Sequence, residues 1–293
     1  MSSSKSHSSS FCCLFIDENP SINFFTMKVV SFIPLLDLKF NFLNKRSSDM
    51  AKIFSLPNYT SILVEGVDSE KLLQGQISCD LALDQNYFNG LFCDEKGYVI
   101  TNAVVIKNSS FEIIVKKNVA QLLIEELHKF AKFFKCDVTE TNKKIYGIAQ
   151  NDSFTKVIDE QETQASESDW MSLTMKNFCI DIDIEYAKKY RINEIGYKFE
   201  NYVSYDKGCY RGQEIIARLT YLGKRVKKNV IFEGSIDHIT NSAGKKIGKK
   251  IFDLELGKES LSQFFVEDTQ YFYENKKINP ISSQWDLNQD QQA

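Results

Sequence analysis

The chain has 293 residues, 43% of them hydrophobic and 26% charged, which is enough to bury the cores of two or three compact units. Its 36 basic and 39 acidic residues give a net charge of -3, which excludes a bulk electrostatic attraction to nucleic acid or to an anionic membrane. The seven cysteines are scattered, without a C-x-x-C pair or a nearby histidine, and so suggest neither a disulfide framework nor a zinc site. This cysteine usage is typical of a reducing cytoplasm, where we expect the protein to act without a resident metal.

Residues 1–49 begin with a serine-rich stretch and continue with short apolar runs that charged residues interrupt. No run reaches the roughly 18 to 20 apolar residues that cross a bilayer, so we expect no membrane association. The segment also lacks the arginine-rich, acid-poor composition of a transit peptide. We expect a disordered or spurious extension here, with the folded body beginning near Met50.

From residue 50 to 225 the pattern is that of a globular body in which strands and helices alternate. Alternating apolar residues predict strands, 3.6-residue apolar spacing predicts helices, and Asp94–Gly97 predicts a hairpin turn. In chain order we expect a strand over 61–67, a helix beginning at 68, a hairpin over 89–105, a strand over 111–115, a helix over 119–134 and a strand over 145–149.

The second part of the body is less regular. The polar and acidic stretch 151–169 predicts a loop or linker, and the alternating run Phe178–Ile184 predicts a strand. A strand and a turn are expected from Val203 to Gly212, followed by a helix over Gln213–Leu219. From 226 to 293, short strands separated by glycine turns predict a separate β-rich domain with a frayed tail.

The segment from Lys207 to Glu214 carries the densest chemistry of the chain. Its glycines allow close approach of a ligand, and the helix start at Gln213 offers unsatisfied N–H groups and partial positive charge. Cys209 lies near this helix start and two residues after Lys207, an arrangement that favours its thiolate. From the residues alone, a lone cysteine is more often a small buried apolar side chain, and that alternative stays open.

Residues 207–214, Lys-Gly-Cys-Tyr-Arg-Gly-Gln-Glu, resemble the K-G-C-Y-x-G-Q-E signature of the YgfZ family. Residues 66–80 resemble its early G-x-D-x-x-x-x-x-Q-G-Q segment, and residues 92–102 resemble its hairpin. That family is related to the aminomethyltransferases of the glycine-cleavage system. The resemblance implies a ring-like α+β fold with two interleaved sheet-and-helix subdomains over 50–225, which bind folate, and a C-terminal β-barrel-like domain.

The resemblance also implies roles for single residues. Cys209 matches the family's functional residue, and Lys207 accompanies it in the motif. Ile184-Glu185-Tyr186-Ala187 resembles a stretch whose glutamate binds the pterin ring in the related aminomethyltransferases, where one carboxylate accepts two adjacent N–H donors. Glu185 is thus implied as the pterin carboxylate, with a plain exposed glutamate as the alternative. Tetrahydrofolate or a folate derivative is the implied cofactor, and four further residues are implied to contact it: Tyr210, Gln213, Glu214 and Asn102.

The pair Thr101-Asn102 bears on whether the protein is an enzyme. The aminomethyltransferases carry paired aspartates at the matching positions, and without that carboxylate the transfer reaction loses its acid–base group. The resemblance therefore implies an accessory protein in iron-sulfur cluster assembly or repair, with iron-sulfur client or assembly proteins as partners, including enzymes that modify tRNA. A folate-dependent aminomethyl or one-carbon transferase is the alternative.

A basic cluster extends from Lys224 to Lys250 and faces only Glu233 and Asp237 within that stretch. It could attract a polyglutamate tail or RNA phosphates, so a weak RNA contact is a third hypothesis. The run lacks aromatic interleaving and a known RNA-binding motif, and a solvated face is the simpler interpretation.

Overall fold

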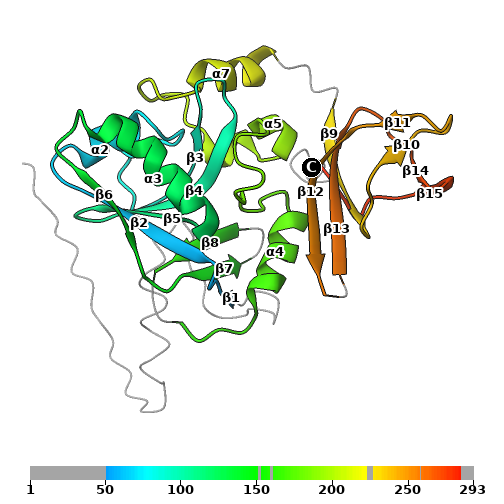
Figure 1. The fold of residues 1–293 in the computed structure, drawn as a ribbon, viewed down its shortest axis with the longest axis horizontal. Coiled ribbons are helices and arrows are strands. Elements are labelled where there is room, and N and C mark those ends of the chain that lie inside the picture. The colour runs from blue at the N-terminus through cyan, green and yellow to red at the C-terminus, as the bar shows by residue number, and fades with distance from the viewer. Residues whose placement is uncertain (1–50, 151–152, 159–160, 223–226, 258, 285–293) are drawn as a thin grey trace, which may run out of the picture. The chain divides into compact units, whose positions relative to one another are not determined.

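The computed structural model describes residues 51–284 except 151–152, 159–160, 223–226 and 258 (Figure 1). The predictions for 1–49 and for the end of the tail lie outside these residues. Within them, helices and strands are mixed, and the strands form four sheets. No helix in the described part of the chain combines the length and the apolar content that crossing a membrane requires.

The largest sheet has five antiparallel strands in the order β3-β4-β5-β2-β6, and the helix α3 lies across it (Figure 1). Apolar residues of α3, such as Leu123 and Leu127, pack on sheet residues such as Ile113 to form one core. The elements are β2 Tyr59–Glu65, α2 Ser69–Gln74, β3 Tyr87–Cys93, β4 Val99–Lys107, β5 Phe111–Lys116, α3 Lys117–Ala131 and β6 Asp137–Thr141. The predicted hairpin and the long helix are confirmed.

A second, three-stranded sheet has the order β1-β7-β8 and packs against α4. The ring of Trp170 on α4 fills the space between them and meets Phe54 edge to face, with 5.4 Å between the ring centroids. The elements are β1 Lys52–Ser55, β7 Tyr146–Gln150, β8 Ser153–Val157 and α4 Glu167–Lys176.

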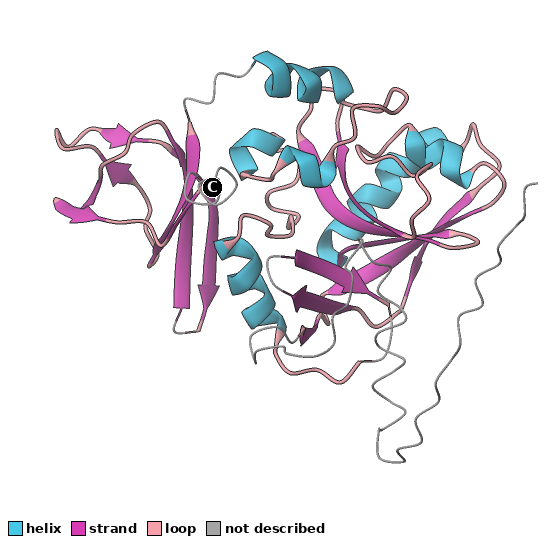
Figure 2. Cartoon of the chain, turned by 180° about the vertical axis from the view of Figure 1, so that it is seen from behind, coloured by secondary structure: helices cyan, strands magenta, loops and turns pink. Residues whose placement is uncertain are grey.

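The C-terminal region consists of two four-stranded sheets, β12-β13-β9-β16 and β11-β10-β14-β15, and neither closes on itself over the described strands. Three short helices precede them, and Figure 2 shows the region from behind. The elements are α5 Ile192–Ile195, α6 Phe199–Tyr202, α7 Gln213–Leu222, β9 Lys228–Glu233, β10 Ile239–Thr240, β11 Lys246–Ile247, β12 Lys249–Leu256, β13 Glu259–Val266, β14 Tyr271–Tyr273, β15 Lys276–Ile278 and β16 Ser282–Ser283.

Both faces of the β9–β13 pair are buried, because alternate residues of a strand point to opposite sides. Phe232 and Phe264 face the other C-terminal sheet, whereas Ile231 and Leu261 join a core with the body residues around Tyr197. Polar contacts cross the same boundary, since the buried amide of Gln263 donates to the carbonyl of Ile195 at 2.6 Å. The β-rich region is thus packed onto the body rather than merely tethered to it.

Three sequence predictions are wrong. The stretch 151–169 contains strand β8 and the start of α4, whose capping box pairs Ser166 with Asp169. Phe178–Ile184 forms no strand, although its alternation is real: Ile180 and Ile182 enter one core while Asp181 enters a buried polar network. The segment after Val203 is irregular up to α7 rather than a strand, because its polar groups bond to loops of the body.

Gly147 provides a test of the packing around Trp170. A Cβ added there would lie 2.6 Å from Trp170 Cε3, and the buried ring cannot move aside. We therefore expect Gly147→Ala to lower the free energy of unfolding by about 1 to 3 kcal/mol in urea denaturation. Gly75→Ala is the matched control, because its Cβ would lie 3.6 Å from the nearest atom, an ordinary contact. Equal stability of the two variants would contradict this packing.

Candidate functional site: the Lys207–Glu214 loop

The loop Lys207–Glu214, called the motif loop below, lies where three distant segments of the chain meet. Its Arg211 N–H donates to the carbonyl of Gly75 at 3.1 Å, and Ser204 just before it donates to Ser78 at 2.9 Å. The Lys207 ammonium donates to the carbonyls of Ile77 and Cys79 at 2.7 and 2.6 Å. The helix α2 region and the motif loop, some 130 residues apart, therefore form one unit.

Lys207 is held as a structural cation rather than presented to solvent. Besides the two carbonyls, its ammonium lies 5.1 Å from the centroid of the Tyr210 ring. Burial lowers the pKa of Lys207 to about 8, against the opposing effect of Cys79 and Asp80. The sequence-predicted site residue Lys207 thus fixes the loop conformation.

Gly212 allows the motif loop to touch the hairpin turn between β3 and β4. Its φ of +84° is in the left-handed region, and a Cβ added there would lie 2.7 Å from the carbonyl oxygen of Asp94. The turn residue Gly97 makes a reciprocal approach, since its own Cβ would lie 2.8 Å from Ile215 Cβ on α7. Two glycines therefore let the third segment, the hairpin, pack directly on the loop.

Arg211 anchors the centre of the loop. Its guanidinium donates to Glu126 of α3 at 2.6 Å and to Glu95 of the hairpin turn at 2.6 Å. The Arg211 and Glu126 side chains are 10% and 5% exposed, so this ion pair is largely shielded from water. Glu126 also accepts from Lys129 and Lys188, each at 2.6 Å.

Glu126 is consequently ionised over a wide pH range. Burial acts to raise its pKa, but hydrogen bonds from three cationic partners outweigh burial and lower that pKa to about 2. Lys188 lies three residues after Glu185, so its bond to Glu126 extends the network to the segment that carries Glu185. One carboxylate thus ties the motif loop, α3 and residues 183–190 together.

Cys209 is an exposed residue of this anchored loop. Among the described cysteines, Cys79 and Cys93 are buried, Cys136 and Cys179 are half-buried, and Cys209 is exposed. Its neighbour Tyr210 is buried. The loop therefore exposes Cys209 while the next side chain, Tyr210, is buried in the protein.

The other motif residues lie at the start of α7. Gln213 is half-buried, with its N–H donating to the carbonyl of Tyr210 at 3.2 Å. Glu214 is 83% exposed and pairs with Arg218 one turn later at 3.2 Å, as expected for residues four apart on a helix. Glu214 is thus available to solvent, and Gln213 lies between the buried and exposed sides of the loop.

Asn102 is part of a buried network centred on Asp181. The Asp181 carboxylate accepts hydrogen bonds from Asn102 at 2.8 Å and Lys156 at 2.6 Å on Oδ1. Tyr59 and Trp170 donate to Oδ2 at 2.7 and 3.2 Å. The side-chain oxygen Oδ1 of Asn102 in turn accepts from the Ile182 N–H at 2.9 Å. Both ends of the Asn102 amide are therefore already occupied within the protein.

This network keeps Asp181 ionised despite complete burial. Burial alone would raise its pKa, but Lys156 and the other donors dominate and lower it. Sequence reasoning missed Asp181, Lys156 and Glu126. An aspartate between Ile180 and Ile182 is a possible signal, because a charged residue within an apolar run must find partners if it is buried.

Glu185 lies in an exposed turn rather than at a strand end. Two residues earlier, Asp183 accepts from Asn118 at 2.7 Å and from Lys116 at 3.3 Å, which fixes the turn on the start of α3. Tyr186 follows and packs edge to face on Phe252, with 4.7 Å between ring centroids. Glu185 thus presents a solvent-accessible carboxylate beside an aromatic cluster.

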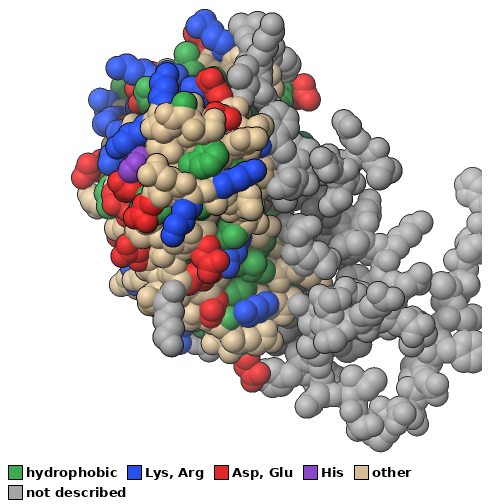
Figure 3. Space-filling model, turned by 90° about the vertical axis from the view of Figure 1, so that its right-hand side faces the viewer, with side chains coloured by type: hydrophobic (Ala, Val, Ile, Leu, Met, Phe, Trp, Pro, Cys, Tyr) green, Lys and Arg blue, Asp and Glu red, His purple; other side chains and the backbone are tan. Residues whose placement is uncertain are grey.

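The lysines of the basic cluster are partly neutralised. Lys224 and Arg225 lie outside the described residues. Lys227 pairs with Glu267, Lys249 with Glu194 and Lys250 with Asp253, at 3.1, 2.8 and 2.8 Å. Figure 3 shows lysines interspersed with acidic side chains on this face. Glu233 and Asp237 are the acids within the stretch itself, and the fold brings three further acids to it from outside.

Comparison with known proteins places this geometry in context. No protein-family model matches the chain. The tRNA-modifying protein YgfZ of Aliivibrio fischeri strain MJ11 is 24% identical over 264 residues, covering 74% of this chain and 82% of that protein. The protein of the same name from Colwellia psychrerythraea is 26% identical over 221 residues, covering 59% and 68%.

The chain is similar to the YgfZ proteins. The resemblance read from the motifs is therefore confirmed across most of the chain. Among solved structures, the glycine cleavage system aminomethyltransferase T from Bartonella henselae matches with a TM-score of 0.60 at 14% identity, covering 78% of this chain and 83% of that one. The YgfZ-like chain thus has an aminomethyltransferase-like α+β fold, as predicted, with two open sheets in its C-terminal region.

The Glu126 cluster predicts a defined pH dependence. Because its pKa falls from 4.5 to about 2 on folding, ionised Glu126 stabilises the folded state above pH 4.5, and this stabilisation is lost as the pH falls toward 2. Its size is about 3 kcal/mol, since one pKa unit corresponds to about 1.4 kcal/mol. Urea denaturation should show Glu126→Gln less stable than wild type at pH 7, with the gap narrowing below pH 4.5. A gap independent of pH would contradict the assignment.

Asn102→Asp tests the Asp181 network. It would place two carboxylate oxygens about 2.8 Å apart in a buried site, so one must take up a proton. We expect a loss of roughly 2 to 4 kcal/mol at pH 7, partly recovered at lower pH because the variant's raised carboxyl pKa favours the protonated form. Asn118→Asp is the matched control, since it makes the same change beside Asp183 at an exposed site. A comparable loss in both variants would contradict the role of burial.

Proposed function

We propose that the chain is a cytoplasmic, tetrahydrofolate-binding accessory protein that assists the assembly or repair of iron-sulfur clusters, including those of tRNA-modifying enzymes. The similarity to proteins named tRNA-modifying protein YgfZ supports the part of this proposal that concerns tRNA modification. The observation that carries the proposal is the motif loop, in which Lys207 and Arg211 are fixed by buried contacts and Cys209 is exposed.

The loop supports a role in which the thiol meets a partner. An exposed cysteine on a loop anchored at two points can contact a cluster or a client protein without rearrangement of the core. Among the described residues, no group of three or more histidine, cysteine or acidic side chains is arranged to hold a metal. We therefore assign any cluster contact to Cys209 acting together with ligands of a partner.

Folate binding is supported by residues around Glu185. Its exposed carboxylate can accept paired N–H donors of a pterin, and the half-buried rings of Tyr186 and Tyr190 beside it offer flat apolar surface. The network through Lys188, Glu126 and Arg211 links this carboxylate to the motif loop. Of the other residues that the resemblance implies, Gln213 and Glu214 remain candidates for contact with the folate. Asn102 and Tyr210 are buried and hold neighbouring parts of the protein in position.

Aminomethyl or one-carbon transfer is the less favoured function. An acid–base group for such a reaction must reach the substrate and change its protonation state. Asn102 has no titratable group, and its amide is bonded to Asp181 and Ile182. Asp181 itself is enclosed by four donors. RNA binding through the basic cluster is also less favoured, because the cluster's described lysines include three that are paired with acids.

Calorimetric titration of the full chain with tetrahydrofolate tests the cofactor. We expect saturable binding in the micromolar range, weakened about tenfold by Glu185→Gln, because a charge-assisted contact becomes a neutral one. Glu65→Gln is the control, an equally simple change at an exposed carboxylate at the end of β2. Absence of binding by the intact chain would exclude tetrahydrofolate, and equal affinity of Glu185→Gln would exclude the assigned carboxylate.

Cys209→Ser tests the thiol. In cells whose own gene copy is deleted, we expect the variant to restore an iron-sulfur client enzyme to only a small fraction of the activity that wild type restores. The melting temperature should not change, because the side chain is exposed. Cys136→Ser, at a half-buried cysteine outside the motif loop, should restore full activity. Full restoration by Cys209→Ser would remove the thiol from the function.

A further inference from the structure

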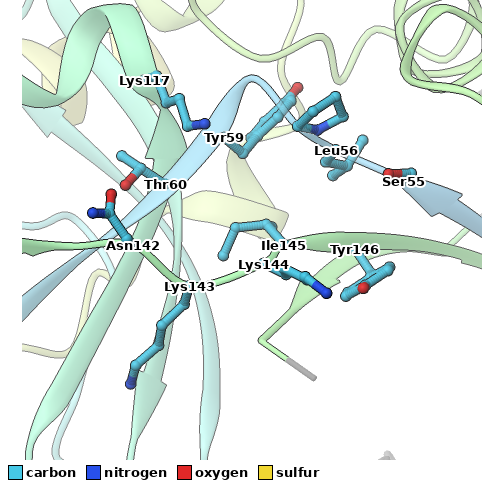
Figure 4. Close-up of a pocket in the computed structure, with 11 residues that line it drawn as sticks. Ser55, Leu56, Tyr59, Thr60, Lys117, Asn142, Lys143, Lys144, Ile145 and Tyr146 are labelled. Carbon is cyan, nitrogen blue, oxygen red and sulfur yellow. The ribbon is translucent and has the colours of Figure 1, made fainter. Parts of the chain in front are cut away.

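Outside the motif loop, the structure has a pocket of about 380 Å³ between the β1–β2 turn and the β6–β7 loop (Figure 4). Its walls offer little apolar surface to a ligand, because Leu56 and Tyr59 are only 1% and 2% exposed. Lys143, which also lines the pocket, is paired with Glu112. A more open surface lies nearer the C-terminus, on the sheet β11-β10-β14-β15.

This sheet has one covered face and one open face, as antiparallel sheets often do. Tyr271 and Tyr273 of β14 pack on the core that contains Phe232 and Phe264 of the neighbouring sheet. Phe272 lies between the two tyrosines in the strand and therefore points to the opposite face. It is half-buried, and among the described residues it belongs to none of the hydrophobic cores.

Strand pairing places a lysine on either side of Phe272. Phe272 lies opposite Lys277 of β15 and opposite Thr240 of β10, which in turn lies opposite Lys246 of β11. Residues opposite each other in neighbouring strands share one face, so these four side chains form a row across the open face, called the Phe272 row below. At about 4.8 Å per strand, the backbones of the two lysines are about 14 Å apart, with the ring between them.

The Phe272 row carries positive charge at both ends. Lys246 and Lys277 are exposed, and no carboxylate of the described residues lies within ion-pair distance of either one. The acids of this sheet, Asp237, Asp268 and Glu274, lie in the connections between its strands and not in the row. Lys246 thus differs from the paired lysines of the basic cluster described above.

An aromatic ring between two cations on an open sheet face has the chemistry that binds a single-stranded nucleic acid. A base can stack on the ring while the phosphates on either side of it meet the cations. An acidic peptide would use the lysines but has no need of a flat ring. A duplex buries the faces of its bases, so it cannot use the ring either.

We propose that the Phe272 row binds single-stranded RNA, with one base stacked on Phe272 and the neighbouring phosphates on Lys246 and Lys277. The choice of RNA over DNA rests on the proposed function, which connects the chain with tRNA modification. Exposed amides support that choice, because Gln270 and Asn279, two residues from Phe272 and Lys277, can bond to 2′-hydroxyl groups.

The test is fluorescence anisotropy of the full chain with a short labelled oligouridine at several salt concentrations. Phe272→Leu keeps most of the apolar volume but removes the flat ring, so it should weaken binding about tenfold without changing the salt dependence. Lys246→Gln combined with Lys277→Gln should reduce the slope of log affinity against log salt by about 1.4, since each phosphate contact of a single strand contributes about 0.7.

Matched controls separate these effects from changes in folding and in net charge. Tyr273→Leu removes the next ring of β14, which faces the core, and should leave RNA affinity unchanged even where the melting temperature falls. Phe272→Tyr retains the ring and should bind like wild type. Lys71→Gln combined with Lys132→Gln makes the same change in charge at exposed lysines of α2 and of the end of α3, and should leave the slope unchanged.

Wild-type affinity in Phe272→Leu, or an unaltered slope in the double lysine variant, would overturn the proposal. Duplex RNA or an oligoglutamate peptide bound as tightly as the single strand would overturn the role of base stacking. Equally tight binding of single-stranded DNA would overturn the assignment to RNA. Wild type and Phe272→Leu should bind tetrahydrofolate with equal affinity, so a failure of this proposal is distinguishable from a failure of the folate proposal.

Discussion

The ion pair between Arg211 and Glu126 is the contact on which the arrangement of the motif loop depends. Both side chains are largely shielded from water, so each charge is costly to bury alone and stable only with its partner. Removing either one deprives the other of its most shielded partner, while Arg211 keeps Glu95 and Glu126 keeps Lys129 and Lys188. The pair is also where three parts of the chain meet, because Lys188 and Glu95 bind the same two residues. The position of the loop is thus determined by charge matching as well as by apolar packing.

This anchoring explains how a loop of irregular backbone can hold an exposed cysteine in a defined position. Lys207 is held by two carbonyls, and Gly212 lets the hairpin turn approach within contact distance. With its neighbours fixed, Cys209 gains exposure without becoming part of a freely moving segment. A pre-positioned thiol loses less conformational entropy when it meets a partner than a thiol on an unanchored loop.

The elements that were predictable from the sequence are those with strong local patterns. The hairpin of β3 and β4 follows from alternation and a glycine turn, and α3 follows from apolar spacing. The acidic composition of 151–169 predicted a loop. The stretch nevertheless contains Lys156 of strand β8 and the capping box at Ser166, and this capping box is a local sequence signal for the start of a helix.

The polar networks could not be predicted in the same way. Asp181 receives hydrogen bonds from residues 11 to 122 positions away in the chain, and no local pattern encodes such partners. The same limit applies to Glu126, which on sequence alone is one more acid on an amphipathic helix. Conversely, the basic cluster looked unbalanced only because Glu194 and Glu267 are distant in sequence. Charge balance in this protein is a property of the tertiary structure.

The central claim is that the exposed thiol and the folate belong to one functional unit. The most direct measurement is the rate at which each cysteine of the folded chain reacts with a maleimide, resolved by peptide mass mapping, with and without tetrahydrofolate. We predict that Cys209 reacts far faster than the buried Cys79 and Cys93, and that tetrahydrofolate slows the reaction of Cys209. Reaction of Cys209 at the rate of the buried cysteines, or a rate that tetrahydrofolate does not change, would contradict the account.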